Sequence, residues 1–263
     1  MVPSRSRTVS WLIALIVPVV LAGCGGKSPA AGAAVDAAAL EASYLAPPRA
    51  DAVRASAGGV VLSGSAPPGG KVRLATPAGQ AMFATADVKG RWTLALPPAA
   101  EPQIFGLSAA VGARLNQAEG YVLVTPGGQA ALLRAGTGAV RIDAVARPGL
   151  RALDFDRGGG LEVSAAVPPG ATVILRLDGR QAAEGRADAR GRYVASLGSP
   201  APIRPGAHQV QVFGDGFSDQ VVVQISPAAP LAQGPFRSQL TPAGLRVDWM
   251  TPGGGEQSTL LVH

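Results

Sequence analysis

Apolar and polar residues alternate with a period of two over many short stretches after residue 57. Val72 and Leu74, for example, alternate with Lys71 and Arg73. In an extended chain this spacing directs every second side chain towards a core and leaves the others outside, so each stretch predicts a half-buried β-strand. The strand candidates are 71–74, 91–96, 103–111, 120–125, 130–135, 139–145, 172–177, 208–214 and 220–226.

One long stretch occurs twice in the chain. The residues SGSAPPGGKVRLATPAGQAMFATADVKGRWTLAL at 63–96 align without a gap with SAAVPPGATVILRLDGRQAAEGRADARGRYVASL at 164–197, an offset of 101 residues. Trp92 of the first copy corresponds to Tyr193 of the second, an aromatic residue for an aromatic residue. A repeat of this length in two copies predicts two tandem domains.

The most similar part of the two copies is Ala-Asp-x-x-Gly-Arg followed by an aromatic residue. We interpret it as a turn in which Asp87 or Asp188 accepts hydrogen bonds from backbone amides and Gly90 or Gly191 adopts a positive φ. The aromatic residue then becomes the first residue of the next strand to enter the core. The alternative is that the two aspartates are metal or sugar ligands, but a single carboxylate beside a glycine is more typical of a turn.

The composition favours short strands joined by many turns. Glycine (35 residues) and proline (23) are abundant, and only 15% of the 263 residues are charged. A helical bundle needs long runs free of Gly and Pro, so this fold class is excluded. About seven short strands in each unit of roughly 90 residues, with turns every 8–12 residues, are typical of an Ig-like β-sandwich.

Two features of the repeat resemble the Ig-like domains of bacterial surface and envelope proteins: the strand opening Pro-Pro-Gly-x-x-Val-x-Leu and the Ala-Asp-x-x-Gly-Arg-aromatic hairpin. The resemblance covers about 57–145 and 158–227. It implies an all-β fold with two tandem Ig-like β-sandwich domains. The disulfide of antibody-type domains cannot form, because the chain contains a single Cys.

The N-terminus predicts export from the cytoplasm. Arg5 and Arg7 precede the apolar segment WLIALIVPVVLAG at 11–23. A short basic segment followed by an apolar run of this length, too short to span a membrane comfortably, is typical of a signal peptide.

The end of this segment, Leu21-Ala22-Gly23-Cys24, resembles the lipobox of bacterial lipoproteins at all four positions. The resemblance implies cleavage before Cys24 and a covalent diacylglycerol and N-acyl lipid, such as palmitate, on this residue. Several acyl chains on one residue give stable membrane anchoring, at about 0.8 kcal/mol for each buried methylene. Gly25 stands where an inner-membrane retention signal would have Asp, so we expect anchoring at the outer membrane, on its periplasmic face.

The expected partners follow from this location. Loss of Arg5 and Arg7 with the signal peptide lowers the formal net charge from +6 to about +4. We expect attachment to the membrane through the lipid, and contact with another envelope protein or with a surface or cell-wall polymer. Nucleic acid is not an expected partner, because the arginines are scattered and the compartment is the wrong one.

The segment DFDRGGGLE at 154–162 contains candidate calcium ligands, namely Asp154, Asp156 and Glu162. It departs from an EF-hand loop, which would need an acidic or amide residue at Gly158 and Glu at Ala165. The sequence favours a solvated Gly-rich linker here, with an interdomain calcium site as the alternative. Asp215 and Asp219 in the later segment GDGFSD at 214–219 are interpreted in the same way as part of a hairpin turn.

No other residues combine into a catalytic or metal site. The two histidines, His208 and His263, are far apart in the chain, and the only Cys is expected to carry lipid. A zinc site needs three or four ligands, and serine catalysis needs a base and a nucleophile elbow that the sequence lacks. We therefore expect no enzymatic activity, no metal and no cofactor other than the lipid.

The sequence thus predicts five segments. They are a lipoprotein signal peptide at 1–23, the lipidated Cys with an Ala/Pro-rich tether at 24–56, an Ig-like domain at 57–145, a linker and second Ig-like domain at 146–228, and a C-terminal β-hairpin at 229–263. This hairpin either completes a sheet or leaves an edge for a partner strand.

The function expected for this arrangement is that of a non-catalytic scaffold or adhesion module at the outer membrane. The alternative is a carbohydrate- or peptidoglycan-binding envelope lipoprotein. That alternative needs an exposed aromatic platform, for which Trp249 and Tyr121 are the candidates.

Overall fold

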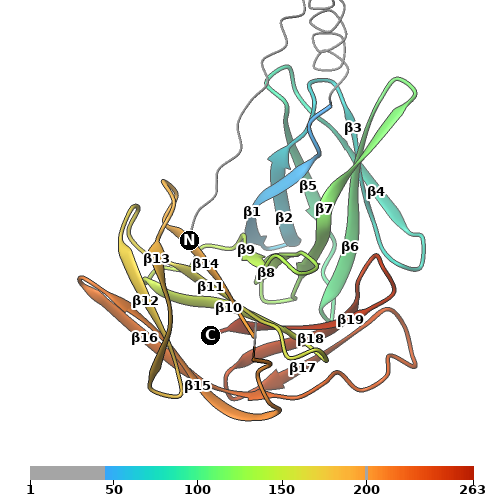
Figure 1. Ribbon diagram of the computed structural model, residues 1–263. Helices are drawn as coiled ribbons and strands as arrows, with labels where there is room; N and C mark the ends of the chain where they lie inside the picture. The colour runs from blue at the N-terminus through green and yellow to red at the C-terminus, as the bar shows by residue number, and fades with distance from the viewer. Residues whose placement is uncertain (1–44, 199–200) are drawn as a thin grey trace, which may run out of the picture. The chain divides into compact units, whose positions relative to one another are not determined.

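The computed structural model describes residues 45–198 and 201–263, and its regular structure there consists of β-strands. Nineteen strands are formed within these two ranges (Figure 1). Among the described residues no helix has the length and apolar character needed to cross a membrane. The predicted signal peptide, the predicted lipobox Leu21–Cys24 and most of the predicted tether lie outside the described residues.

The first half of the described chain forms two sheets. One has the strand order β1-β2-β5, and the other has the order β4-β3-β6-β7-β8-β9. All neighbouring pairs are antiparallel. The strands are β1 (Arg49–Ser56), β2 (Gly59–Ser65), β3 (Lys71–Ala75), β4 (Ala81–Thr85), β5 (Arg91–Leu96), β6 (Gln103–Val111), β7 (Arg114–Val124), β8 (Ala130–Leu133) and β9 (Val140–Arg141).

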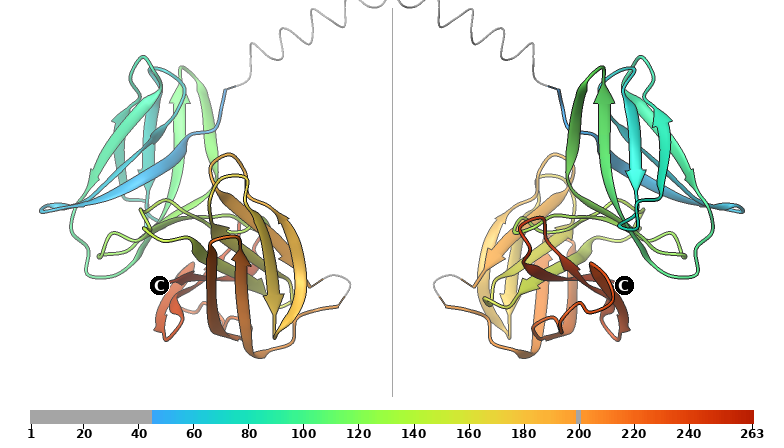
Figure 2. Two further views of the ribbon diagram at one scale, coloured as in Figure 1. Left: turned by 90° about the vertical axis from the view of Figure 1, so that its left-hand side faces the viewer. Right: turned by 90° about the vertical axis from the view of Figure 1, so that its right-hand side faces the viewer.

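The second half also forms two sheets, with the orders β14-β11-β10-β19-β18-β17 and β13-β12-β15-β16. The side views in Figure 2 show the red C-terminal strands lying against the yellow and orange strands of the same half. The strands are β10 (Gly149–Asp156), β11 (Leu161–Ala166), β12 (Thr172–Leu177), β13 (Arg180–Arg186), β14 (Arg192–Leu197), β15 (Gly206–Gly214), β16 (Phe217–Ile225), β17 (Phe236–Thr241), β18 (Gly244–Met250) and β19 (Glu256–Val262).

The two halves share one topology, as the repeat predicts. The order β1-β2-β5 corresponds to β10-β11-β14, and β4-β3-β6-β7 corresponds to β13-β12-β15-β16. In each half the apolar faces of the two sheets enclose one core. The prediction of an all-β fold with two tandem Ig-like sandwiches is therefore confirmed.

Each core contains the aromatic residue of the repeated motif. Trp92 is 2% exposed and Tyr193 is 4% exposed, and each follows the repeated turn as the first inward residue of its strand. Around them lie mainly Val and Leu side chains such as Leu62, Leu74 and Leu175, all fully buried. The Trp92 indole Nε1 donates a hydrogen bond to the Ser65 carbonyl oxygen at 3.1 Å, so its polar end is satisfied inside the core.

The repeated motif is the predicted turn in both copies. Asp87 Oδ1 accepts hydrogen bonds from the backbone amides of Lys89 and Arg91, both at 2.8 Å. Asp188 Oδ1 accepts the same two bonds in the second copy, at 2.8 and 2.9 Å. Gly90 and Gly191 both have φ of 75°. The two carboxylates are thus engaged by their own turns, which is the structural interpretation that the sequence favours.

Three segments differ from the sequence-based expectation. Residues 49–56, expected in the tether, form β1 because Ala50 and Val53 enter the first core. Residues 154–162, expected as a solvated linker, are the end of β10, a tight turn and the start of β11. The C-terminal segment forms the expected hairpin, β18 and β19, which completes a sheet because β19 pairs with β10, but it also has a third strand, β17, that was not expected.

The two sandwiches contact each other through a third apolar cluster, and Leu45–His263 form one compact unit. Ile104, Leu123 and Leu133 come from β6, β7 and β8, while Trp249 and Leu261 come from β18 and β19. The Tyr121 and Trp249 rings meet edge to face, with centroids 5.9 Å apart and planes at 88°. The six-stranded sheet of the second sandwich is therefore buried on both of its faces around β10, β18 and β19.

The repeated turn allows a direct test with a matched control. A Cβ added at Gly191 would lie 2.2 Å from the Val167 carbonyl oxygen, whereas one added at Gly170 would meet nothing within 4 Å. Both glycines have positive φ, 75° and 72°, which costs a non-glycine residue about 1–2 kcal/mol. We expect Gly170→Ala to lower the free energy of unfolding by that amount and Gly191→Ala to lower it by about 3 kcal/mol. Urea denaturation followed by tryptophan fluorescence measures both; equal losses would contradict the predicted backbone clash.

Candidate functional site

The candidate calcium ligands lie at the β10–β11 hairpin, and the structure gives each of them a separate structural contact. The Asp156 side chain accepts a hydrogen bond from Gly160 N at 3.2 Å inside the turn. Glu162 Oε2 accepts one from the Ser196 hydroxyl at 2.6 Å. Asp154 points into the contact between the two sandwiches and is 2% exposed. Among the described residues no group of three acidic, His or Cys side chains is arranged to hold a metal ion.

Asp154 is the centre of a buried hydrogen-bond network. Its Oδ1 accepts bonds from the Thr259 hydroxyl and, at 3.0 Å, from the Gln257 amide, and its Oδ2 accepts one from Ala139 N at 2.6 Å. The Trp249 indole Nε1 donates to Thr259 Oγ1 at 3.0 Å, which connects the network to the apolar cluster. Because Ala139 belongs to the first sandwich and Thr259 to the second, the carboxylate joins the two.

Burial raises the pKa of Asp154 from its ordinary value of 3.8 to about 6, against the opposite effect of its three hydrogen bonds. The folded protein therefore holds this proton more tightly than the unfolded chain does. The contribution of Asp154 to stability is full at pH values below about 4 and is lost as the pH rises through about 6.

We expect this loss to amount to about 3 kcal/mol. It is measured as the difference in free energy of unfolding between the parent protein and Asp154→Asn, determined at intervals from pH 4 to pH 8. Relative to Asp154→Asn, the free energy of unfolding of the parent protein should fall as the pH rises from 4 to 6.5. Above pH 6.5 it should fall only slightly further. A difference independent of pH would mean that Asp154 titrates near its ordinary value.

The remaining acidic candidates, Asp215 and Asp219, lie at and near the β15–β16 hairpin. Asp215 is exposed in the turn, as the sequence indicates. Asp219 reaches the first strand of the second sandwich, where its Oδ2 accepts a hydrogen bond from Leu150 N at 2.9 Å. The sequence gives no signal for this contact, because the two residues are 69 positions apart.

His208 is held in an ion pair rather than in a metal or catalytic site. Its Nδ1 lies 2.7 Å from Asp178 Oδ2, and its Nε2 lies 2.8 Å from the Arg204 carbonyl oxygen. Both neighbours are acceptors, so the doubly protonated imidazolium fits the site best. Burial lowers the pKa of His208, but the bonds to Asp178 and the Arg204 carbonyl outweigh it, and the net pKa is raised above 6.5.

The titration of His208 can be followed directly, because the chain contains one other histidine, His263. Two imidazole resonances are expected in an NMR pH titration, and that of His208 should have a midpoint above 6.5. Asp178→Asn should lower this midpoint. Since the folded pKa is the higher one, the pair stabilises the fold below pH 6.5 and loses that effect as the pH rises through the folded pKa. An unchanged His208 midpoint in the variant would contradict the ion pair.

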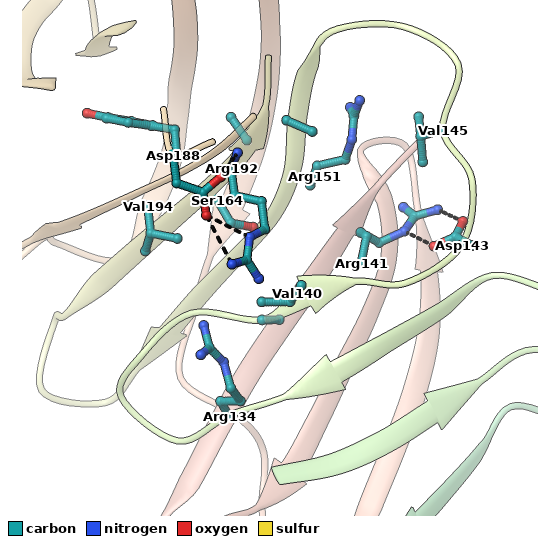
Figure 3. Close-up of a pocket in the computed structure, with 14 residues that line it drawn as sticks. Arg134, Val140, Arg141, Asp143, Val145, Arg151, Ser164, Asp188, Arg192 and Val194 are labelled. Atoms are coloured by element: carbon teal, nitrogen blue, oxygen red, sulfur yellow. Dashed lines mark hydrogen bonds and ion pairs between the residues drawn. The ribbon is translucent and has the colours of Figure 1, made fainter. Parts of the chain in front are cut away.

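Sequence analysis did not predict an arginine-lined pocket beside the contact between the sandwiches. It has a volume of about 400 Å³ and is lined by residues within 139–145, 164–166 and 192–194 and by three single residues, Arg134, Arg151 and Asp188 (Figure 3). Four arginines line it, from the residue after β8 and from β9, β10 and β14, together with two aspartates. They are Arg134, Arg141, Arg151, Arg192, Asp143 and Asp188.

The arginines of the pocket differ in how their guanidinium groups are held. Arg141 forms a nearly buried, two-bonded ion pair with Asp143. Arg151 is 8% exposed and donates to the carbonyl oxygens of Leu150 and Arg147, but forms no ion pair within the described part of the chain. Burial, and then the charge of Arg141, lower the pKa of Arg151. The pocket thus holds more cationic than anionic groups.

The position of Trp249 and Tyr121 bears on the alternative of a carbohydrate-binding protein. Trp249 has no exposed surface, and Tyr121 packs against it. The aromatic platform that this alternative would use is therefore not formed by these two residues. Their side chains stabilise the contact between the sandwiches instead.

Comparison with known proteins adds little to these observations. No family model and no curated protein matches the chain. One solved structure that it matches is named "Biofilm associated protein - BSP domain" and is 14% identical, with a TM-score of 0.24. The match covers 70% of this chain and 30% of the other, so the chain spans less than a third of that protein. At this TM-score the fold assignment is based on the order and pairing of the strands alone.

Proposed function

We propose that this chain is a non-catalytic, lipid-anchored protein of the bacterial cell envelope, and that its two sandwiches form a structural or interaction module at the outer membrane. The observation that supports this most is the use of the titratable side chains. Asp87 and Asp188 bind their own turns, Asp154 joins the sandwiches, and His208 pairs with Asp178. In these contacts the groups hold the fold, which supports a non-catalytic role.

The anchoring part of the proposal depends on the lipobox at Leu21–Cys24. A lipid at this position would tether the folded part through residues 25–48, which precede the first strand. The sandwiches would then face a partner in the envelope, either a protein or a surface or cell-wall polymer. No cofactor other than the lipid is part of this function.

A second candidate function is the binding of a cell-envelope carbohydrate. The arginine-lined pocket favours an acidic saccharide over a neutral one, because a neutral sugar would leave the excess positive charge of the pocket without a partner. Buried Trp249 disfavours the aromatic stacking that neutral-sugar binding commonly needs.

Lipid anchoring and partner binding can be tested together in the native cells. The parent protein should incorporate an alkyne-labelled palmitate and fractionate with membranes, whereas Cys24→Ser should do neither, because no other thiol is present. Chemical cross-linking of the parent should then recover a defined envelope protein or a glycan that is lost with Cys24→Ser. A labelled or membrane-bound Cys24→Ser protein would refute the lipid anchor, and absence of any specific cross-link would refute the interaction module.

A further inference from the structure

The arginine-lined pocket exists because the outer face of one sheet is only partly covered. The first sandwich packs over β10, β18 and β19, where the outer face is apolar. The same face continues over β11 and β14, where it carries polar and charged residues such as Ser164 and Arg192. The segment after β8 passes beside this uncovered part and supplies Arg134. The pocket is therefore built from both sandwiches.

Two guanidinium groups converge in this pocket. Figure 3 shows Arg134 and Arg192 pointing towards each other beside Val140, one from each sandwich. Arg192 is paired with Asp188, whereas Arg134 has no carboxylate partner within the described residues, so one positive charge of the two is left for an anion between them to balance. The hydrogen bonds that hold each arginine in its own turn do not require the two side chains to face each other.

Each of the two groups is held at one side and open at the other. Arg134 donates from Nε to the Gly138 carbonyl oxygen at 3.1 Å and from Nη2 to the Thr137 carbonyl oxygen at 3.0 Å. Arg192 donates from Nε to Asp188 Oδ2 at 3.0 Å, and its Nη2 lies 3.0 Å from the same oxygen. Within the described part of the chain, Nη1 of each donates no hydrogen bond. Donors that are fixed before binding lose little entropy when a ligand arrives.

The repeat supplies an internal comparison for Arg192. Arg91 occupies the same place in the first copy and binds Asp87 in the same manner, at 3.0 Å. Its side chain is 71% exposed, whereas that of Arg192 is 42% exposed. Both copies thus contain an arginine–aspartate pair at the turn, and in the second copy the arginine is less exposed and lines the pocket.

We propose that this pocket binds an oxyanionic group, a carboxylate or a phosphate, carried by a small saccharide. Arg134 and Arg192 hold the anion between their Nη1 groups, and Arg151, which forms no ion pair within the described part of the chain, gives the remainder of the pocket its positive potential. Guanidinium groups match the planar or tetrahedral oxygens of these anions and bind them strongly when partly desolvated. The volume of about 400 Å³ is within the range of about 300–1,000 Å³ typical of small-molecule sites.

This inference deepens the proposed function. It rests on the proposed location in the cell envelope, because that location suggests a saccharide as the carrier of the anion. It does not require the lipid anchor, and its test is performed with purified protein. A failure here would leave the anchored interaction module intact, whereas a failure of the cross-linking experiment would not exclude an anion site.

The test is a titration of the full chain, purified in detergent, with four probes measured by calorimetry. The probes are digalacturonic acid for a sugar carboxylate, glucose 1-phosphate for a sugar phosphate, inorganic phosphate, and maltose as the neutral control. We expect digalacturonic acid or glucose 1-phosphate to bind more tightly than inorganic phosphate, with an affinity that falls as salt rises, and maltose not to bind. The stronger of the first two identifies which oxyanion the pocket prefers.

Substitutions locate the site. Arg192→Gln and Arg134→Gln should each weaken the binding at least about tenfold, the effect of losing one charge-assisted hydrogen bond. Arg91→Gln is the matched control, because it removes the equivalent turn ion pair outside the pocket, and it should leave the affinity unchanged. Circular dichroism and the urea midpoint of each variant show whether it is folded.

NMR provides a second measurement that does not depend on substitution. Titration with the probe that binds should shift the methyl resonances of Val140 and Val194, which line the pocket. The methyl resonances of Val88, which is 90% exposed and does not line the pocket, should not shift. Three results would overturn the proposal: no binding of either acidic saccharide at millimolar concentration, equal weakening by Arg91→Gln and Arg192→Gln, or shifts confined to residues outside the pocket.

Discussion

The structure depends on one sheet that must be buried on both faces. In the second sandwich, strands β10, β18 and β19 present Leu153 and Leu260 to the sandwich core and Trp249 and Leu261 to the opposite side. A sheet of an isolated antiparallel sandwich can leave its outer face in water, but an outer face with a Trp and several aliphatic residues cannot remain exposed without a large cost. The first sandwich covers this face with β6, β7 and β8, which makes residues 45–263 one unit.

A buried carboxylate gives this apolar contact its specificity. Asp154 accepts bonds from Ala139 of one sandwich and from Thr259 and Gln257 of the other. Apolar surfaces can slide over one another with little change in energy, whereas a displaced carboxylate would leave buried donors without acceptors. The cost is a carboxyl group whose pKa is raised to about 6 by burial. We interpret Asp154 as the residue that fixes the register between the sandwiches.

The arginine-lined pocket is a consequence of the same arrangement. The covering sandwich reaches β11 and β14 only through the segment after β8, where Gly138 lies against Val194 and Glu162, so the sheet surface there is only partly covered and carries polar residues. Arg134 and Arg192 are 58 positions apart in the sequence, and both line the pocket at this edge. The equivalent arginines of the two copies therefore lie in different surroundings. Arg91 stabilises a turn that faces water, whereas Arg192 stabilises a turn at the wall of a pocket.

Much of the fold follows from the sequence by itself. The period-two alternation, the repeat with its offset of 101 residues, and the Asp-x-x-Gly turns determine strands, tandem organisation and hairpins, because each depends only on local backbone geometry and on which side chains are apolar. The burial of Trp92 and Tyr193 follows from the same local pattern. The predicted lipobox, likewise, depends on a contiguous motif.

The tertiary structure alone decided where residues distant in sequence meet. The pattern cannot show that 49–56 is a strand, that β19 pairs with β10, or that Trp249 faces the other sandwich, because each depends on a surface formed elsewhere in the chain. Asp154 has the spacing of a loop ligand, and only the packing of two sheets around it makes it a buried structural group. The pocket is invisible in the sequence for the same reason: its charge comes from arginines that are scattered along the chain and are brought together only when the sandwiches pack.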